Sequence, residues 1–470
     1  MNPRLIRAGA ALGAALALGG CTLDPAYQRP AAPVPAAWPT GPAYAPAAGE
    51  AALAGWRDVF TDPRLRAVID QALANNRDLR VAVANIAAAR AQYHVQRAAL
   101  MPQVSASGGA SYASEPLSVE TGGSRPGFFN LHQYSANVGV SAYEVDLFGR
   151  LHSLSRAAQD QYLATEQARR AAQISLVSEI GAAWLSLAGD RSLLQLAQDT
   201  LASDTETLEL TRSRFDHGVA SALDVAQAKG AVEQAKSDVA AYTTLAAQDR
   251  NALELLVGAP VADERLPAGL DAEPPLAETP AGISSSVLLQ RPDVLQAEAQ
   301  LKADNADIGA ARAAFFPSIS LTGSGGATSL ALSDLFTGAA RSWSFGPTIT
   351  LPLFAGGKNT ANLAYAKAER DAAVATYEKA VQTAFREVAD ALARRGTIDD
   401  QLAAQDAQSA AAADALSLAR ARYARGSDSY LNLLIAQRTL YAARQSLVAT
   451  QLARAANRVT LYAALGGGWD

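Results

Sequence analysis

The chain has 470 residues, with 45 acidic against 40 basic side chains and a formal net charge of −5. This mildly acidic balance argues against a nucleic-acid partner, and the single cysteine excludes an intrachain disulfide and a cysteine-rich metal site. The four histidines (His94, His132, His152 and His217) are widely scattered, which favours surface or packing roles over metal binding or catalysis.

Residues 1–20 have the pattern of a lipoprotein signal peptide. Two arginines precede an apolar segment, Ala8 to Leu18, that is too short to cross a bilayer. The Leu-x-Gly-Cys pattern that ends at Cys21 is typical of bacterial lipoproteins, in which this cysteine is acylated and becomes the first residue. Thr22, rather than aspartate, favours the outer membrane. An ordinary signal peptide with an incidental cysteine is the alternative.

Residues 21–61 form the lipidated N-terminal segment, which is rich in proline and alanine and has almost no charge over residues 22–50. This composition predicts an extended tether rather than a packed element. One acyl chain binds a membrane only marginally, so we expect more lipid or a second membrane element to complete the anchor. No later run of about 20 apolar residues predicts a transmembrane helix.

Residues 62–258 form the first of two repeats. A helical pattern runs from Asp62 to Leu100 and stops before a proline. Two alternating segments, at about 103–113 and 133–147, then predict β-strands joined by a loop rich in glycine, serine and proline. In the second segment, strict alternation would place Ala142 on the same face as Tyr134 and Tyr143 on the opposite face. A helical hairpin follows, with its tip at about 215–221.

Residues 259–290 form a proline-rich connector and equatorial region, and residues 291–470 repeat the plan of the first half. A helix begins this second repeat. Strands are predicted at about 318–325 and 342–354, followed by a second hairpin with its tip at about 423–429.

The two hairpin tips are near-copies that lie 208 residues apart, with Phe215 matching Tyr423. A seven-residue spacing before each tip predicts helices that coil around their neighbours. Gly218 and Gly426 are expected to end one helix in a left-handed conformation, and Ser221 and Ser429 to cap the next. The spacing is carried by Leu194, Leu201, Leu208 and Phe215 in the first repeat, and by Leu402, Ser409, Leu416 and Tyr423 in the second.

Each strand segment has the length and period of a transmembrane β-strand. Four strands cannot close a barrel, and open edges are not tolerated in lipid, so copies of the chain must share one wall: eight strands from two copies or twelve from three. Helices of about 65 residues would extend roughly 100 Å, and their many alanines allow close approach. The combination predicts a conduit.

The mature sequence resembles TolC-like outer-membrane factors, specifically the lipoprotein branch often called the NodT family. The resemblance implies an α+β membrane protein: a homotrimer with a twelve-stranded outer-membrane β-barrel, four strands per protomer, that continues into a long periplasmic coiled-coil barrel with an internal repeat and an equatorial belt. It also implies a periplasmic adaptor and an inner-membrane pump, usually of the resistance-nodulation-division class. The motifs that carry it are Pro25–Pro30, Arg291–Val294, Ile308–Arg312, Phe315–Pro317 and Leu461–Trp469.

The same resemblance places adaptor contacts and a constriction at the tips. Any helix-turn-helix would also use the glycines and serines there. The adaptor-contact residues are Arg212, Phe215, Gly218, Ser221, Leu223 and Asp224 at one tip, and Arg422, Tyr423, Gly426 and Ser429 at the other.

The expected periplasmic gate consists of Leu431, Asn432 and Ile435. Relatives carry a leucine ring and acidic rings here. Leu431 fits the leucine, whereas Asn432 and Ile435 depart from the acidic residues. An apolar constriction could gate by steric closure or dewetting, and coiled-coil packing of Ile435 is the alternative.

The predicted function is therefore the exit duct of a tripartite efflux pump that passes small molecules such as drugs. The alternative within transport is a duct for type I protein secretion or ABC-type export. No catalytic motif is present, so we expect no enzyme activity and no cofactor beyond the covalent lipid on Cys21. A passive coiled-coil adhesin would account for the heptads but not for the four strands.

Overall fold

The computed structural model describes residues 22–44, 55–116, 128–270, 276–277 and 284–468. The predicted signal peptide and Cys21 lie outside the described residues. The chain divides into two compact units, and each takes residues from both repeats, so the units cut across the duplication. Unit 1 comprises Met1–Pro30, Ile86–Thr165 and Ala297–Tyr377, and unit 2 comprises Ala31–Asn85, Glu166–Gln296 and Glu378–Asp470.

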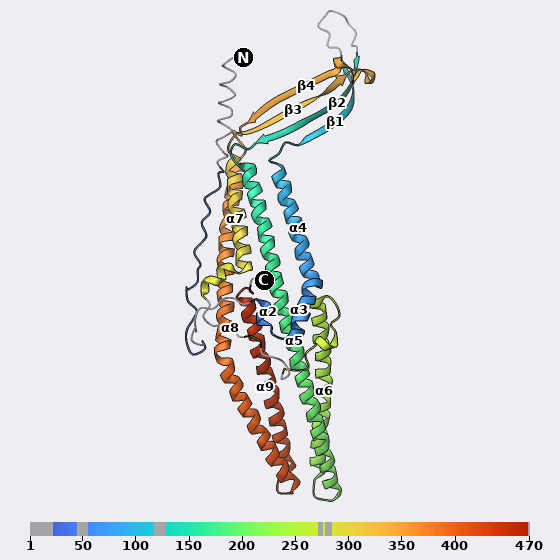
Figure 1. Ribbon diagram of the computed structural model, residues 1–470, viewed down its shortest axis with the longest axis vertical. Helices are drawn as coiled ribbons and strands as arrows, with labels where there is room; N and C mark the ends of the chain where they lie inside the picture. Colours follow the sequence, from blue (N-terminus) through green and yellow to red (C-terminus); the bar gives the residue numbers. More distant parts are fainter. Residues whose placement is uncertain (1–21, 45–54, 117–127, 271–275, 278–283, 469–470) are drawn as a thin grey trace, which may run out of the picture. The chain divides into compact units, whose positions relative to one another are not determined.

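The order of elements confirms the predicted repeat, because each half contains a helix, two strands and a helical hairpin (Figure 1). The long helices α5 and α8 each have 67 residues, which corresponds to about 100 Å of helix. The elements are α2 (Trp56–Val59), α3 (Pro63–Asn75), α4 (Arg77–Ala98), β1 (Val104–Pro116), β2 (Phe128–Val145), α5 (Arg150–Asp216), α6 (Ala222–Val257), η1 (Asp263–Arg265), η2 (Ser285–Gln290), α7 (Pro292–Ala313), β3 (Ser318–Ser329), η3 (Leu332–Asp334), η4 (Gly338–Ala340), β4 (Arg341–Thr350), α8 (Lys358–Ala424) and α9 (Tyr430–Ala464).

Helix α5 differs from the sequence expectation in one respect. Among the described residues, it is the one helix long and apolar enough to cross a membrane by length and composition, and 44% of its most apolar window is buried. The sequence pattern predicted no such helix. A core helix that packs along its length passes the same test, so the finding is weak evidence for a membrane span.

The predicted helix from Asp62 to Leu100 is in fact two helices, α3 and α4. Asn76 separates them: its side-chain Oδ1 accepts a hydrogen bond from the Leu79 amide at 2.8 Å, and its Nδ2 donates to the Leu256 carbonyl at 2.8 Å. Asparagine side chains compete with helical hydrogen bonds in this way. The apolar period alone could not reveal the interruption.

Unit 1 contains a four-stranded antiparallel sheet in the order β1-β2-β3-β4 (Figure 1). All four predicted strands are present, with shifted ends. The last strand ends at Thr350 rather than at residue 354, and Pro352, which cannot donate to a ladder, lies just beyond it. The second strand already begins at Phe128.

A bulge in β2 makes the predicted alternation wrong at its end. Ala142 has φ 53° in the left-handed region, and the register shifts between Val140 and Tyr143. One extra residue moves the following side chains to the other face. Tyr143 therefore pairs with Leu321 and shares the face that Val140 occupies before the bulge, instead of lying opposite to it.

The N-terminal part of unit 1 is extended, as predicted, but it is packed rather than free. Asp24 accepts a hydrogen bond from the Ser153 hydroxyl at 2.5 Å. Glu298, whose side chain is only 4% exposed, accepts from Tyr27 at 3.0 Å and from Arg29 at 2.6 Å. The expectation of a loose tether is wrong here because a few polar side chains, which composition averages away, fasten the segment to α5 and α7.

This packing gives a physical reason for two of the motifs that carry the family resemblance. The segment that contains Pro25 lies against the helix that contains Gly309: Asn305 Nδ2 donates to the Pro25 carbonyl at 2.7 Å, and Arg312 to the Leu23 carbonyl at 2.9 Å. A Cβ atom at Gly309 would lie 1.7 Å from Asp24 Oδ1. Only glycine permits this approach.

The largest core of unit 2 forms where α3, α5 and α6 meet. Trp184 is 1% exposed, and its indole nitrogen donates to the Arg265 carbonyl at 3.1 Å. A Cβ atom at Gly181 would lie 2.7 Å from the Phe60 ring, so a small residue is required where α5 passes it. Fully buried members of this core are Phe60, Leu65, Val68, Ile69, Ile180, Leu187, Leu253 and Val257.

Candidate functional site

Both hairpin turns in unit 2 end their first helix in the predicted way. Gly218 and Gly426 have φ 74° and φ 72°. The next residue reaches back five positions in each turn, from the Val219 amide to the Arg214 carbonyl at 2.8 Å and from the Ser427 amide to the Arg422 carbonyl at 3.0 Å. This hydrogen bond defines a glycine-terminated helix end. The prediction for both glycines is confirmed.

At the first tip, Ser221 caps α6 as predicted. Its hydroxyl accepts from the Asp224 amide at 3.1 Å, and the Asp224 carboxylate accepts from the Ser221 amide at 2.9 Å. This reciprocal pair satisfies two amides that the helix leaves open. Phe215, Val219 and Leu223 are 45%, 64% and 64% exposed, so the turn presents apolar side chains to its surroundings.

At the second tip, the prediction that Ser429 caps α9 through its hydroxyl is wrong. Ser429 makes no side-chain capping bond. Asp428 takes over: its carboxylate accepts from the Ser429 amide at 2.8 Å, from Asn432 Nδ2 at 2.6 Å and from Arg422 Nε at 3.2 Å. The hydrogen bond from Asn432, followed by that from the Ser429 amide, lowers the pKa of Asp428.

Tyr423 and Phe215 match in sequence but not in environment. Tyr423 is 3% exposed and packs edge-on against Tyr430, with ring centres 5.8 Å apart. Its hydroxyl lies 3.1 Å from Thr211 Oγ1, and the Arg214 guanidinium lies 4.6 Å from the centre of its ring. Arg214 also donates to the Tyr423 carbonyl. Tyr423 therefore connects the two hairpins and is not on the tip surface.

A buried polar layer that the sequence analysis missed continues this connection along α5. Gln437 Nε2 donates to Thr207 Oγ1 at 3.2 Å, and Arg420 donates to Ser203 Oγ at 2.6 Å. Asp204 is 8% exposed, and its burial raises its pKa to about 6. Its position between two heptad leucines was the available signal, because a carboxylate on a packing stripe calls for an explanation.

The expected gate residues lie on one exposed side of α9. Leu431 and Ile435 are 51% and 53% exposed and, at a spacing of four, stand on the same face. Asn432 is exposed and holds Asp428. Tyr430 and Leu433, by contrast, are buried in a cluster with residues of α5 and α6. Within one protomer, Ile435 therefore does not take part in the coiled-coil packing that was its alternative interpretation.

The sheet of unit 1 has one apolar face and one polar face, since residues paired across antiparallel strands point to the same side. Trp343, Phe345 and Ile349 on the apolar face are 83%, 64% and 68% exposed. That face also carries Val104, Ala106, Ala110, Tyr112, Tyr134, Ala136, Val138, Val140, Ile319 and Leu321, whereas the opposite face carries Ser105, Ser107, Ser111, Ser135, Asn137, Ser320, Thr322, Ser324, Ser342, Ser344 and Thr348.

Residues 68–259 and 283–467 match the family model for outer membrane efflux proteins. The chain belongs to this family. It is 49% identical to a probable efflux pump outer membrane protein, TtgC of Pseudomonas putida, over 97% of this chain and 94% of the relative. It is 44% identical to the outer membrane protein OprJ of Pseudomonas aeruginosa, over 98% and 95%.

Solved structures agree with this assignment. A membrane protein from Pseudomonas aeruginosa superposes with a TM-score of 0.88 at 44% identity, over 96% of this chain and 98% of that chain. The open state of the MtrE outer membrane channel of Neisseria gonorrhoeae superposes with a TM-score of 0.83 at 39% identity, over 95% and 98%. The protein is a TolC-like outer-membrane factor, that is, an efflux channel of the outer membrane, as the sequence predicted.

Proposed function

We propose that three copies of this chain form a twelve-stranded barrel that continues into a coiled-coil duct. The observation that carries the proposal is the sheet of unit 1, which has two open edges, β1 and β4, and one exposed apolar face. Open edges leave backbone groups without partners in lipid, so copies must pair edge to edge. The serine- and threonine-rich face would then line the pore.

Cross-linking between the edges tests the trimer. Cysteine at Ser107 of β1, combined in turn with cysteine at Ser342, Ser344 or Thr348 of β4, samples the register on the polar face. At least one pair should give a ladder that ends at three chains under oxidation, and native mass spectrometry should give the same number. A ladder that ends at two chains, or a monomer in both experiments, would refute the trimer.

We propose that the duct serves a tripartite efflux pump with a periplasmic adaptor and an inner-membrane pump of the resistance-nodulation-division type. Relatives are named as toluene, solvent and antibiotic efflux pump outer membrane proteins, which supports small organic molecules as cargo. No chemistry on the cargo is proposed. Deletion of the gene should increase susceptibility to solvents and antibiotics. Unchanged susceptibility together with loss of a secreted protein would instead favour type I secretion.

The exposed pair on α9 supports an apolar gate at the second tip. Replacing Leu431 and Ile435 by serine together should raise single-channel conductance and antibiotic uptake, because water would wet the constriction. Serine at Leu245 and Leu418, which are 41% and 65% exposed on other helices, is the matched control. Equal conductance in the two double variants would remove the gate from the proposal.

The lipid anchor is likewise a proposal, since Cys21 lies outside the described residues. Metabolic labelling with a palmitate analogue should label the wild-type protein and not a Cys21→Ala variant. Label that persists in the variant would refute acylation at this residue. We expect the variant to retain its trimer, because the sheet edges and not the lipid hold the copies together.

A further inference from the structure

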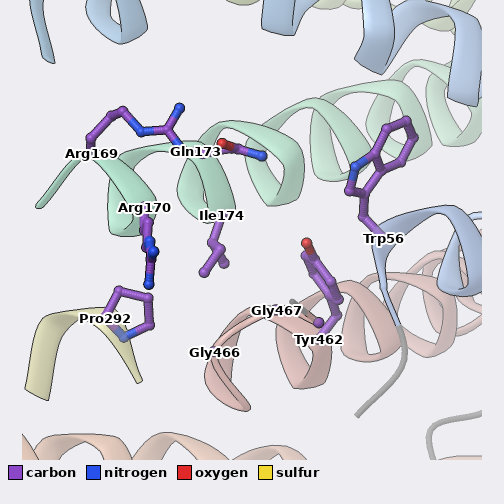
Figure 2. Close-up of a pocket in the computed structure, with 10 residues that line it drawn as sticks. Trp56, Arg169, Arg170, Gln173, Ile174, Pro292, Tyr462, Gly466 and Gly467 are labelled. Atoms are coloured by element: carbon purple, nitrogen blue, oxygen red, sulfur yellow. The ribbon is translucent and has the colours of Figure 1, made fainter. Parts of the chain in front are cut away.

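A cavity of about 290 Å³ opens in unit 2, away from the hairpin tips (Figure 2). Helix α5 forms one wall with Arg169, Arg170 and Ile174, and Trp56 of α2 stands across from the arginine pair. Tyr462 of α9 and the glycine turn that follows this helix close the lower side. The volume is at the small end of the range for ligand sites in proteins.

The cavity carries uncompensated positive charge. Arg169 and Arg170 are neighbours in sequence, and neither makes a hydrogen bond or an ion pair with any residue that the structure describes. No carboxylate is among the described residues that line the cavity. Arginine in this protein is otherwise paired at similar places: Arg291, close by, binds Asp293 and Glu387 at 2.7 and 2.9 Å. Two unpaired guanidiniums at one cavity favour an anion.

A second, independent feature also points to an acceptor in the cavity. Trp56 is 3% exposed, and its indole nitrogen, a donor only, is turned toward the cavity in Figure 2. No described residue accepts a hydrogen bond from this nitrogen. A buried indole N–H usually has a partner. The missing partner and the two guanidiniums call for the same group, an oxygen that carries negative charge.

The remaining walls are apolar and closely fitted. Ile174 and the rings of Trp56 and Tyr462 face the space (Figure 2). Gly467 has φ 58°, and a Cβ atom there would lie 2.8 Å from Ile174 Cγ1 and 3.0 Å from the Tyr462 hydroxyl. Glycine therefore lets the turn approach the other two walls. A flat apolar body would fit between the aromatic rings.

We propose that this cavity binds a small aromatic carboxylate. Arg169 and Arg170 pair with the carboxylate, the Trp56 indole donates to it, and the ring lies against Ile174 and Tyr462. The site is separate from the duct proposed above, and binding here does not depend on transport. It would make the channel protein responsive to a class of small acid.

Titration calorimetry of the purified full-length protein with 1-naphthoate tests the proposal. Saturable binding of one ligand per chain is expected, and 1-naphthalenemethanol, which lacks the charge, should bind at least about tenfold more weakly. The double variant Arg169→Gln/Arg170→Gln should also lose at least about tenfold in affinity, because a charge-assisted hydrogen bond contributes on the order of the 1.4 kcal/mol that corresponds to tenfold.

Two further variants separate a site from general surface charge. Arg386→Gln/Arg444→Gln removes two exposed arginines elsewhere in unit 2 and should leave binding unchanged. Gln173→Trp keeps both cavity arginines, fills the space and should abolish binding; it remains informative if the arginine double variant fails to fold. Absence of saturable binding, equal losses in the two arginine pairs, or normal binding by Gln173→Trp would each overturn the proposal.

Discussion

The two hairpin turns of unit 2 share a sequence pattern and a backbone turn, but their side chains have different tasks. At the first turn, Ser221 caps the helix and Phe215 is exposed. At the second, Asp428 replaces the serine cap, and Tyr423 is buried against α5. Local sequence therefore determined the turn, whereas packing between helices determined which aromatic is core and which is surface. Only the exposed aromatic can take part in an adaptor interface.

Truncation of the two matched aromatics tests this difference most strongly. Tyr423→Ala should reduce the free energy of unfolding of the tip region by about 3–5 kcal/mol, as for other buried aromatics, whereas Phe215→Ala should change it by less than about 0.5 kcal/mol. Hydrogen-exchange protection of tip peptides measures both. We expect Phe215→Ala to weaken adaptor binding instead, because it removes exposed apolar surface at the first tip.

Tyr423→Phe is the matched control for this pair. It keeps the ring against Tyr430 and removes only the hydroxyl that lies 3.1 Å from Thr211, so a loss of about 1 kcal/mol is expected. Equal losses for Tyr423→Ala and Phe215→Ala would mean that the two turns are equivalent in the assembled protein.

Asp204 gives the connection between the hairpins a pH dependence. Burial raises its pKa from 3.8 to about 6, so the folded protein binds more protons than the unfolded chain between these values, and stability falls as pH rises through this window. Asp204→Asn should remove this slope and, at pH 7, stabilise the protein by up to about 3 kcal/mol, less the lost attraction to Arg420 and Arg438.

Thermal melting of the protein in detergent from pH 4 to pH 7 measures the effect. The wild-type melting temperature should decrease across this range and that of Asp204→Asn should stay level, relative to a control with the exposed Asp216→Asn. A wild-type melting temperature that rises across the same range would contradict the raised pKa.

The serines at the two turns offer a smaller, sharper comparison. Ser221→Ala should cost about 1 kcal/mol because it removes the hydroxyl that accepts from the Asp224 amide. Ser429→Ala should cost less than about 0.3 kcal/mol, since that hydroxyl caps nothing. Exchange protection of the first turns of α6 and α9 reports each change separately. A larger loss at Ser429 would restore the serine cap that the sequence predicted.

Periodic and local signals made most of the fold predictable. The heptads located the long helices, alternation located the four strands, and glycine placed the turns. The misses occur where one polar side chain decides the structure: Asn76 breaks a helix, Asp428 displaces a serine cap, and Asp24 fastens a segment whose composition indicated a tether. The positions of the tip residues were predictable, but the burial of Tyr423 depends on a residue 212 positions away, Thr211, that no local pattern identifies.

The smallest expected effect concerns Asp428, the residue that replaces the serine cap. Hydrogen bonds from Asn432 and the Ser429 amide lower its pKa, so it stabilises the turn above its ordinary pKa of 3.8, and this contribution is lost as pH falls through the lowered value. Protection of the α9 start, corrected for intrinsic exchange, should therefore decrease only below about pH 4. Asp428→Asn should flatten this response and Asp216→Asn should not. A response that persists in Asp428→Asn would assign the low-pH loosening to another carboxylate and leave the second turn without its distinguishing cap.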